Sequence, residues 1–358
     1  MATTGHHQAN QKQPTPTKAP SAQATTAPGT TPERLFNAFN AHAQTAAIKT
    51  AVELEIFTAI AEGKTSPSAV AQRCDIAERG ARILCDFLTI HGFLTKTGAN
   101  YGLAPDSAMF LDRHSPSYVG SAIDFMLSQR VMEAHAKLTD AVRSGRSALG
   151  EAALEPENPI WLRFAEAMAP LTMMPAQGAA AELRRSGEVH KVLDIAAGHG
   201  IYGVAVAQQN PKAQVYAADW KNVLTVAQRN AQRAGVADRY HLLPGSAFES
   251  DFGHDYDLVL IPNFLHHFDL PTCTRFLNKV HGALAADGRA AVIEFVPNTD
   301  RVTPPAAAGF SLTMLAMTPS GDAYTFAELE KMAKDAGFSR VEISPVELGV
   351  NRLVVAYH

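Results

Sequence analysis

A histidine and a glutamate in the C-terminal half of the chain have the residue types needed to move a proton. His266 lies in the segment Ile261–Asp269, directly after an apolar stretch, and Glu294 closes the next apolar stretch. A histidine can take a proton from a hydroxyl near neutral pH. A neighbouring carboxylate fixes its tautomer and stabilises its charged form. We expect the two residues to lie at adjacent strand ends, with His266 as a general base supported by Glu294.

A glycine loop precedes this pair in the chain. An apolar stretch ends in Asp194, Gly198 and Gly200 follow it, and a second apolar stretch ends in Asp219. Glycine allows a sharp turn and lets the backbone lie against a ligand. A strand, a glycine loop, a helix and a second strand that ends in an acid form a nucleotide-sized site at the carboxyl edge of a parallel sheet.

The pattern Asp-x-Ala-x-Gly-x-Gly resembles the first motif of class I S-adenosylmethionine (SAM) methyltransferases. On that resemblance, Asp219 accepts hydrogen bonds from both ribose hydroxyls and Trp220 covers one face of the adenine. Asp194, beneath the loop, holds the methionine ammonium directly or through water. SAM is therefore the expected cofactor, and the sequence shows no cluster of acids placed to bind a metal.

The same loop has a rival interpretation as a dinucleotide site. The segment Gly198–Gly203 also matches G-x-G-x-x-G, and Asp219 follows at about the right distance for NAD. SAM is favoured because Asp194 precedes the first glycine and the motif lies past the middle of the chain. No further residues look arranged for hydride transfer, so a NAD-dependent oxidoreductase is the alternative class.

The composition limits the class of protein. The 358 residues suffice for two domains, and 46% of them are hydrophobic. A net charge of −4 argues against a nucleic-acid or membrane-surface partner. Cys74, Cys85 and Cys273 form no C-x-x-C pair, so free thiols in a reducing, cytoplasmic compartment are expected. We find no apolar run long enough to span a membrane and no signal peptide.

The chain divides into three expected parts. Residues 1–30, rich in Thr, Pro, Ala and Gln, form a disordered tail. Residues 31–170 form a mostly helical winged-helix domain and a connector, and residues 171–358 form the ligand-binding domain. Helical spacing predicts helices through residues 35–60, from the Ser66 cap, over 77–91 and throughout 117–186, with a hairpin over 92–103.

A winged helix invites a DNA-binding hypothesis, including a regulator that senses SAM. Basic and acidic residues are nearly equal in number between Glu62 and Lys96, with no basic stripe for phosphates. Dimerisation is the expected role of this module.

The C-terminal part alternates between strand and helix patterns. We expect an α/β fold, a doubly wound seven-stranded sheet with an antiparallel last pair. Strands are predicted at 190–195, 214–219, 239–243, 256–261, 289–295, 338–345 and 351–357. Helices are predicted at 201–209, 222–234, 271–285 and 325–336.

The chain, over about residues 35–358, resembles the O-methyltransferases related to the caffeate, hydroxyindole and isoflavone enzymes. In that family a histidine in a His-Asp-Trp-Ser-Asp segment abstracts the phenolic proton. Counting back from the helix at Cys273 places His266 at that position and His267 at the following acid. The resemblance implies that Glu294 supports the histidine, that the protein is a homodimer, and that the acceptor is a small aromatic molecule.

Two positions depart from the family pattern. The family's Gly-Asp-Met-Phe segment, whose acid contacts the adenine amine, is Gly245-Ser246-Ala247-Phe248 here. We expect Ser246, Ala247 and Phe248, together with Asn263, to contact the cofactor. A second acid near the family's histidine is replaced by Ala323. This change leaves room for an easily ionised hydroxyl, or for carbon methylation of an activated ring.

The acceptor pocket is expected between the helical connector and the segments that follow the strands. Phe164 and Met168 belong to an apolar face that suits either ordinary helix packing or a pocket for a flat ligand. His267 and Met314 complete the expected pocket.

Overall fold

The computed structural model describes residues 1–3, 31–150 and 157–358 in two separate units. The predicted disordered tail falls almost entirely outside the described residues. One unit comprises residues 1–46 and includes the first part of α1 (Glu33–Glu53). Leu35, Phe36 and Phe39 of this part are 55%, 59% and 69% exposed, so α1 carries an uncovered apolar face. Residues 47–358 form the second unit.

Short helices and a hairpin follow α1, in the order expected for a winged helix. The predicted continuous helix to residue 60 is wrong, because Glu55 adopts a left-handed conformation with φ of 57° and ends the helix. The Ser66 cap is confirmed, since its hydroxyl oxygen accepts a hydrogen bond from Ala69 N–H. The elements are α2 (Ile56–Ala61), α3 (Pro67–Cys74), α4 (Glu78–Ile90), β1 (Leu94–Thr97), β2 (Asn100–Leu103) and α5 (Pro105–Phe110).

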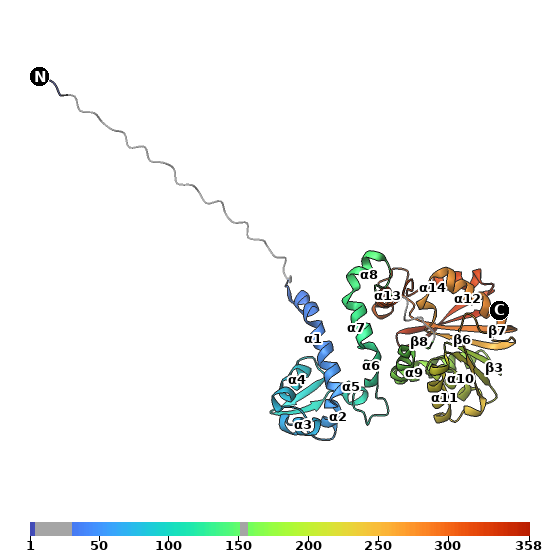
Figure 1. Ribbon diagram of the computed structural model, residues 1–358, viewed down its shortest axis with the longest axis horizontal. Coiled ribbons are helices and arrows are strands. Elements are labelled where there is room, and N and C mark those ends of the chain that lie inside the picture. Colours follow the sequence, from blue (N-terminus) through green and yellow to red (C-terminus); the bar gives the residue numbers. More distant parts are fainter. Residues whose placement is uncertain (4–30, 151–156) are drawn as a thin grey trace. The chain divides into compact units, whose positions relative to one another are not determined.

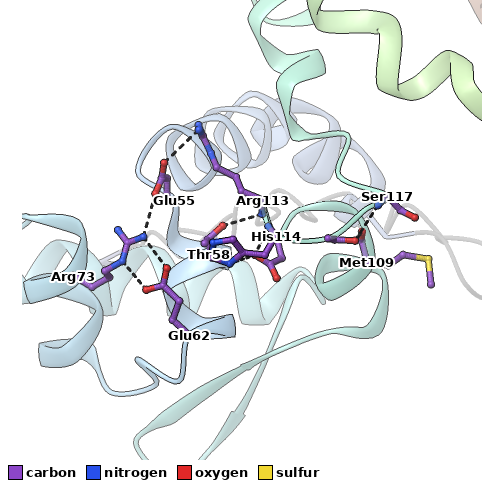
Figure 2. A network of polar contacts seen from close by, with 10 residues as sticks. Glu55, Thr58, Glu62, Arg73, Met109, Arg113, His114 and Ser117 are labelled. Atoms are coloured by element: carbon purple, nitrogen blue, oxygen red, sulfur yellow. Dashed lines mark hydrogen bonds and ion pairs between the residues drawn. The ribbon is translucent and has the colours of Figure 1, made fainter. Parts of the chain in front are cut away.

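A polar network joins α2 to α3 and to the segment after α5 (Figure 2). Arg73 Nε donates to Glu62 at 2.7 Å, and its Nη2 reaches Glu55 at 3.3 Å. Arg113 pairs with the other Glu55 oxygen at 3.3 Å, and its backbone N–H donates to Thr58 Oγ1 at 3.0 Å. The Arg73 guanidinium lowers the pKa of Glu62. Partly exposed ion pairs contribute little energy each, so the network mainly fixes geometry around the left-handed turn.

The connector between the two halves is helical with breaks. The prediction of helix throughout 117–186 is wrong at these breaks; Gly145, for example, ends α8 with φ of 70°. Residues 151–156 lie outside the described part of the chain. Pro170 and Pro175 both lie inside the last helix. The elements are η1 (Gly120–Ala122), α6 (Ile123–Met126), α7 (Gln129–Ala136), α8 (Leu138–Ser144) and α9 (Pro159–Arg185).

The C-terminal half contains the predicted seven-stranded sheet, in the order β5-β4-β3-β6-β7-β9-β8. The first five strands pair in parallel, whereas β9 is antiparallel to both β7 and β8. The antiparallel end is therefore confirmed. The strands are β3 (Lys191–Ile195), β4 (Gln214–Asp219), β5 (Tyr240–Pro244), β6 (Tyr256–Pro262), β7 (Leu284–Glu294), β8 (Arg340–Leu348) and β9 (Asn351–Tyr357).

Helices cover both faces of this sheet (Figure 1). Adjacent strand residues serve opposite cores: Val192 packs in the core beneath α9 and α10, and Leu193 in the core beneath α12 and α14. The helices are α10 (Ile201–Gln209), α11 (Lys221–Arg233), α12 (Leu270–Ala283), α13 (Pro305–Met317) and α14 (Phe326–Asp335), with short turns η3 (Ala237–Arg239) and η4 (Leu265–His267). The predicted helix list omitted α13.

The strand order determines where a ligand site can form. The chain runs from β3 outward through β4 to β5, then returns to place β6 on the other side of β3. Such a switch point opens a crevice at the carboxyl ends of the two central strands. The loops after β3 and β6 therefore meet there. Of the helices described, none is long and apolar enough to cross a membrane.

Candidate active site

The loop after β3 needs its two glycines for different reasons. Gly198 has φ of 59°, and a Cβ there would meet nothing closer than Ala196 O at 3.7 Å. Its backbone conformation, rather than crowding, therefore favours glycine. Gly200, with φ of 72°, caps α10, and a Cβ there would lie 2.5 Å from the Tyr240 hydroxyl. Gly200 thus permits close packing against Tyr240 and Ala227. The sequence had instead suggested that both glycines make room for a ligand.

Two carboxylates hold this loop. Asp219, at the end of β4, accepts from Gly198 N–H at 2.8 Å and from Trp220 N–H at 2.6 Å. Asp194 is fully buried in β3, and its Oδ2 accepts from Gly203 N–H at 3.1 Å. The other Asp194 oxygen, Oδ1, is buried without a hydrogen-bond partner. Both acids thus lie at the sheet edge, as the sequence predicts. Each carboxylate can still accept a hydrogen bond from a ligand.

The electrostatics of these acids favour a cationic ligand. Burial raises the pKa of Asp194 to about 8 and that of Asp219 to about 6. Within residues 31–150 and 157–358, no lysine, arginine or histidine forms an ion pair with either. A buried acid without a counter-charge is stabilised in its ionised form by a cation or by hydrogen-bond donors that enter the site.

A lysine of α12 holds the loop after β5 in place through hydrogen bonds. Lys279 Nζ donates to the carbonyl oxygens of Ala247, Phe248 and Ser250 at 3.1, 2.9 and 2.6 Å. Ser246 Oγ accepts from Phe248 N–H at 3.2 Å, which fixes the turn. The Phe248 ring is 39% exposed and packs against the rings of Phe264, Phe268 and Phe276.

Trp220 follows Asp219, and Asn263 follows β6; the sequence did not reveal what surrounds either residue. Trp220 is partly buried against Ala165 and the first turns of α11. Asn263 follows β6 with φ of 52°, and its Oδ1 accepts from Asn351 Nδ2 at 3.0 Å. Its N–H donates to Ile293 O at 2.8 Å. Asn263 therefore shapes the turn toward η4, and its predicted cofactor contact stays a prediction.

His266 and Glu294 form a buried pair at the carboxyl edge of the sheet. His266 Nδ1 lies 2.6 Å from Glu294 Oε2, and the His266 N–H donates to Oε1 at 3.3 Å. The two residues are 5% and 3% exposed. With Glu294 ionised, Nδ1 carries the proton of the neutral ring, so Nε2 holds the free lone pair. No described residue hydrogen-bonds to Nε2, which leaves it available to a hydroxyl.

Aromatic rings continue from this pair as a series of neighbouring contacts that we call the aromatic row. Burial and the neighbouring His266 lower the pKa of His267 well below its ordinary value, so its ring is neutral. Phe295 stacks on Phe310 with ring centroids 3.8 Å apart. The aromatic row consists of Phe310, His266, His267, Trp161, Phe164 and Phe125, with successive ring centroids 4.9, 4.3, 5.4, 6.0 and 4.9 Å apart.

Part of the aromatic row agrees with the sequence predictions. Of the predicted pocket residues, His267 and Phe164 belong to it. Met168 and Met314 each lie four residues after a ring of the row, on the same faces of α9 and α13. Phe125 of the row and the neighbouring Phe295 were not predicted. Phe295 carried one sequence signal, since it follows Glu294 at a strand end.

The segment before α14 packs directly against the two histidines. A Cβ at Gly321 would lie 2.1 Å from His266 O, so this backbone approach requires glycine. Ala323 is buried and brings no carboxylate to the site. The neighbouring Asp322 is paired with Arg301 at 3.3 Å. Among the described residues, no group of three His, Cys, Asp or Glu side chains could hold a metal ion.

The sheet order and the glycine loop with its two acids are those of the class I methyltransferase fold. The comparisons identify the family: residues 135–339 match the O-methyltransferase domain, and residues 36–113 match the O-methyltransferase dimerisation domain. The first match alone covers more than half of the chain. This protein therefore belongs to the O-methyltransferase family, and the NAD-dependent alternative is wrong.

Relatives and solved structures agree with this assignment. The 3-hydroxy-5-methyl-1-naphthoate 3-O-methyltransferase of Streptomyces sahachiroi is 26% identical over 307 residues, which cover 83% of this chain and 87% of the relative. A solved candidate O-methyltransferase from Nostoc punctiforme is 52% identical, with a TM-score of 0.89 over 92% of this chain and 100% of that one. Human N-acetylserotonin methyltransferase, solved with SAM, shares the fold at 20% identity, with a TM-score of 0.80 over 94% and 99%.

Proposed function

We propose that this protein transfers the methyl group of SAM to a hydroxyl oxygen of a small aromatic acceptor, with His266 as the general base. The observation that carries the proposal is the buried contact of 2.6 Å between His266 Nδ1 and Glu294. It orients the free Nε2 at the sheet edge that also bears Asp194 and Asp219. A histidine with a free ring nitrogen and two buried acids without a positive partner at one edge suit a hydroxyl acceptor and a methyl donor that carries positive charge.

The residues around the glycine loop fit SAM. Asp194 has an orphaned carboxylate oxygen, and the raised pKa values of Asp194 and Asp219 mark acids that lack a positive partner. The ammonium of SAM would supply positive charge near Asp194, and the ribose hydroxyls would donate to Asp219. When bound, SAM supplies a methyl group already activated by its sulfonium.

The chain's own residues then account for proton transfer and orientation. His266 Nε2 takes the hydroxyl proton, and Glu294 stabilises the resulting imidazolium through Nδ1–H. The aromatic row provides ring faces and edges for a flat acceptor. The neutral His267 offers a hydrogen-bonding nitrogen where a family member has an acid. Positioning supplies much of the acceleration, because the transferred group needs little further activation.

Two measurements test this function. Isothermal titration calorimetry with S-adenosylhomocysteine (SAH) tests the cofactor site, with NADH as the contrasting ligand. Labelled SAM with a panel that includes 3-hydroxy-5-methyl-1-naphthoate and acetylserotonin, the compounds named for relatives, tests transfer. We expect SAH binding, and transfer that His266→Ala reduces by at least about 100-fold. His254→Ala, at an exposed histidine, is the matched control.

Failure of wild-type protein to bind SAH contradicts the cofactor assignment, and full activity of His266→Ala contradicts the base. The product decides the atom methylated: a ring methyl instead of a methyl ether would establish the carbon-methylating alternative.

We also propose that the protein acts as a homodimer, and that it works in the cytoplasm as the sequence interpretation expects. The matched dimerisation domain and the exposed rings of Phe36 and Phe39 support the dimer, with a second copy of this chain covering α1.

A further inference from the structure

His199 lies inside the glycine loop but does not face outward. It is 6% exposed, and Ile201 N–H donates to its Nδ1 at 3.2 Å. With Nδ1 occupied as an acceptor, the proton of the neutral ring is on Nε2. Nε2 lies 3.0 Å from Thr172 Oγ1 in α9, and Thr172 in turn donates to Met168 O at 3.1 Å. Donors and acceptors thus alternate without conflict from the loop to Met168.

Each end of this chain of hydrogen bonds lies next to residues that we place in the donor site or the acceptor site. At the loop end, Gly198 N–H is held by Asp219, the proposed ribose ligand. At the helix end, Met168 lies four residues after Phe164 of the aromatic row. Asn230 Nδ2 donates to His199 O at 2.8 Å, which anchors the loop residue from α11 as well.

Around Thr172, helix α9 has fewer backbone hydrogen bonds than a regular helix. Pro170 and Pro175 flank Thr172, and each lacks the N–H that an interior helix residue contributes. The local backbone therefore has fewer hydrogen bonds to fix its path. A side-chain contact from the loop can then decide where this part of α9 lies.

We propose that the His199–Thr172 contact is a positioning link through which the occupied glycine loop orders the acceptor-facing part of α9. The inference rests on the proposed SAM site. It makes His199 and Thr172 positioning residues, since neither is assigned a contact with donor or acceptor. Donor binding would restrict the loop, and the link would pass that restriction to Met168 and its neighbours.

Matched variants separate the link from the fold. Thr172→Val keeps the shape and removes the hydroxyl, whereas Thr172→Ser keeps the hydroxyl. His199→Asn retains an acceptor near the Nδ1 position, and His199→Gln retains a donor near Nε2. Thermal unfolding identifies any variant that does not fold, and the remaining variants still test the link.

The readout is amide hydrogen exchange with and without SAH. In wild type and Thr172→Ser, we expect SAH to slow exchange both in residues 196–203 and in residues 165–175. In Thr172→Val and His199→Asn, protection of 165–175 is lost while that of 196–203 remains. SAH affinity falls by at most about fivefold, as for one neutral hydrogen bond. His199→Gln restores part of the helix protection.

The double variant sharpens the test. Each single variant already removes the His199–Thr172 contact. The double variant His199→Asn with Thr172→Val should therefore behave like either single variant. If SAH binds to wild type but leaves 165–175 unprotected, or if Thr172→Ser fails like Thr172→Val, the link is wrong and the proposed function stands. If wild type does not bind SAH, both fail together.

Discussion

Glu294 Oε2 lies 2.6 Å from His266 Nδ1, and both side chains are buried at the carboxyl ends of adjacent strands. The second carboxylate oxygen accepts the backbone N–H of the same histidine at 3.3 Å. The glutamate therefore fixes the position of the ring as well as its tautomer. In the proposed mechanism, a hydroxyl at Nε2 would complete the arrangement in which His266 acts as a base.

Glu294→Gln should lower kcat by about 10²–10⁴, because the amide can accept only one of the two hydrogen bonds and lacks the charge that stabilises the imidazolium. SAH affinity should change less than about twofold, since the pair supports the acceptor side. Methyl transfer to the best acceptor of the panel and calorimetry measure the two effects. Glu249→Gln, at an exposed glutamate, should behave as wild type; equal kcat in the two variants refutes the supporting role.

SAH affinity should depend on pH through Asp219. Burial raises the pKa of this acid to about 6, so it loses its charge as the pH falls below that value. The affinity should then fall by up to about tenfold per pH unit, whereas above pH 7 this group contributes no further change. Asp219→Asn should bind weakly without this dependence. Asp238→Asn, an exposed control, should retain it.

Asp194→Asn should stabilise the ligand-free protein more at pH 8 than at pH 5. Burial raises the Asp194 pKa from 3.8 to about 8, so the folded protein holds a proton that the unfolded chain releases. Wild type accordingly loses stability from this group as the pH rises from about 4 to 8. The difference between the two pH values should be about 3–4 kcal/mol in urea unfolding. An equal effect at both pH values contradicts the raised pKa.

Gly321→Ala should reduce methyl transfer and stability together. Its Cβ would meet His266 O at 2.1 Å, so the backbone of the two histidines must move. We expect a loss of about 1–3 kcal/mol in the free energy of unfolding. Gly309→Ala in α13 has open space at the Cβ position and should gain about 0.5–1 kcal/mol. Denaturant unfolding and activity measurements on both variants compare crowding with helix propensity.

Phe36→Glu with Phe39→Glu should convert a dimer to a monomer. The two rings are 59% and 69% exposed in the single chain, and charges there would oppose burial against a second copy. Light scattering after size-exclusion chromatography gives the mass. Val302→Glu, which changes another exposed apolar residue, should leave the dimer intact. A wild-type monomer would remove the basis for the dimer proposal.

The local sequence pattern was sufficient to predict the strands and helices that carry the candidate site. The predicted limits of β4, β9 and α10 agree with the structure, because an apolar run bounded by glycine or an acid has few alternative registers. The order of acids and glycines likewise placed Asp194, Asp219 and the loop at one edge. The break at Glu55 was missed, since the apolar spacing continues through it.

The sequence by itself thus determined the sheet, the edge that bears the candidate site and the pairing of His266 with Glu294, because strand ends in a parallel sheet share one edge. Only the tertiary structure decided that Phe295 lies against His266 and Phe125 against Phe164, that Gly321 lies against His266, and that His199 turns inward to Thr172. These contacts join residues that are far apart in the chain. They depend on how side chains of different elements pack together, and such packing leaves no periodic pattern in the sequence.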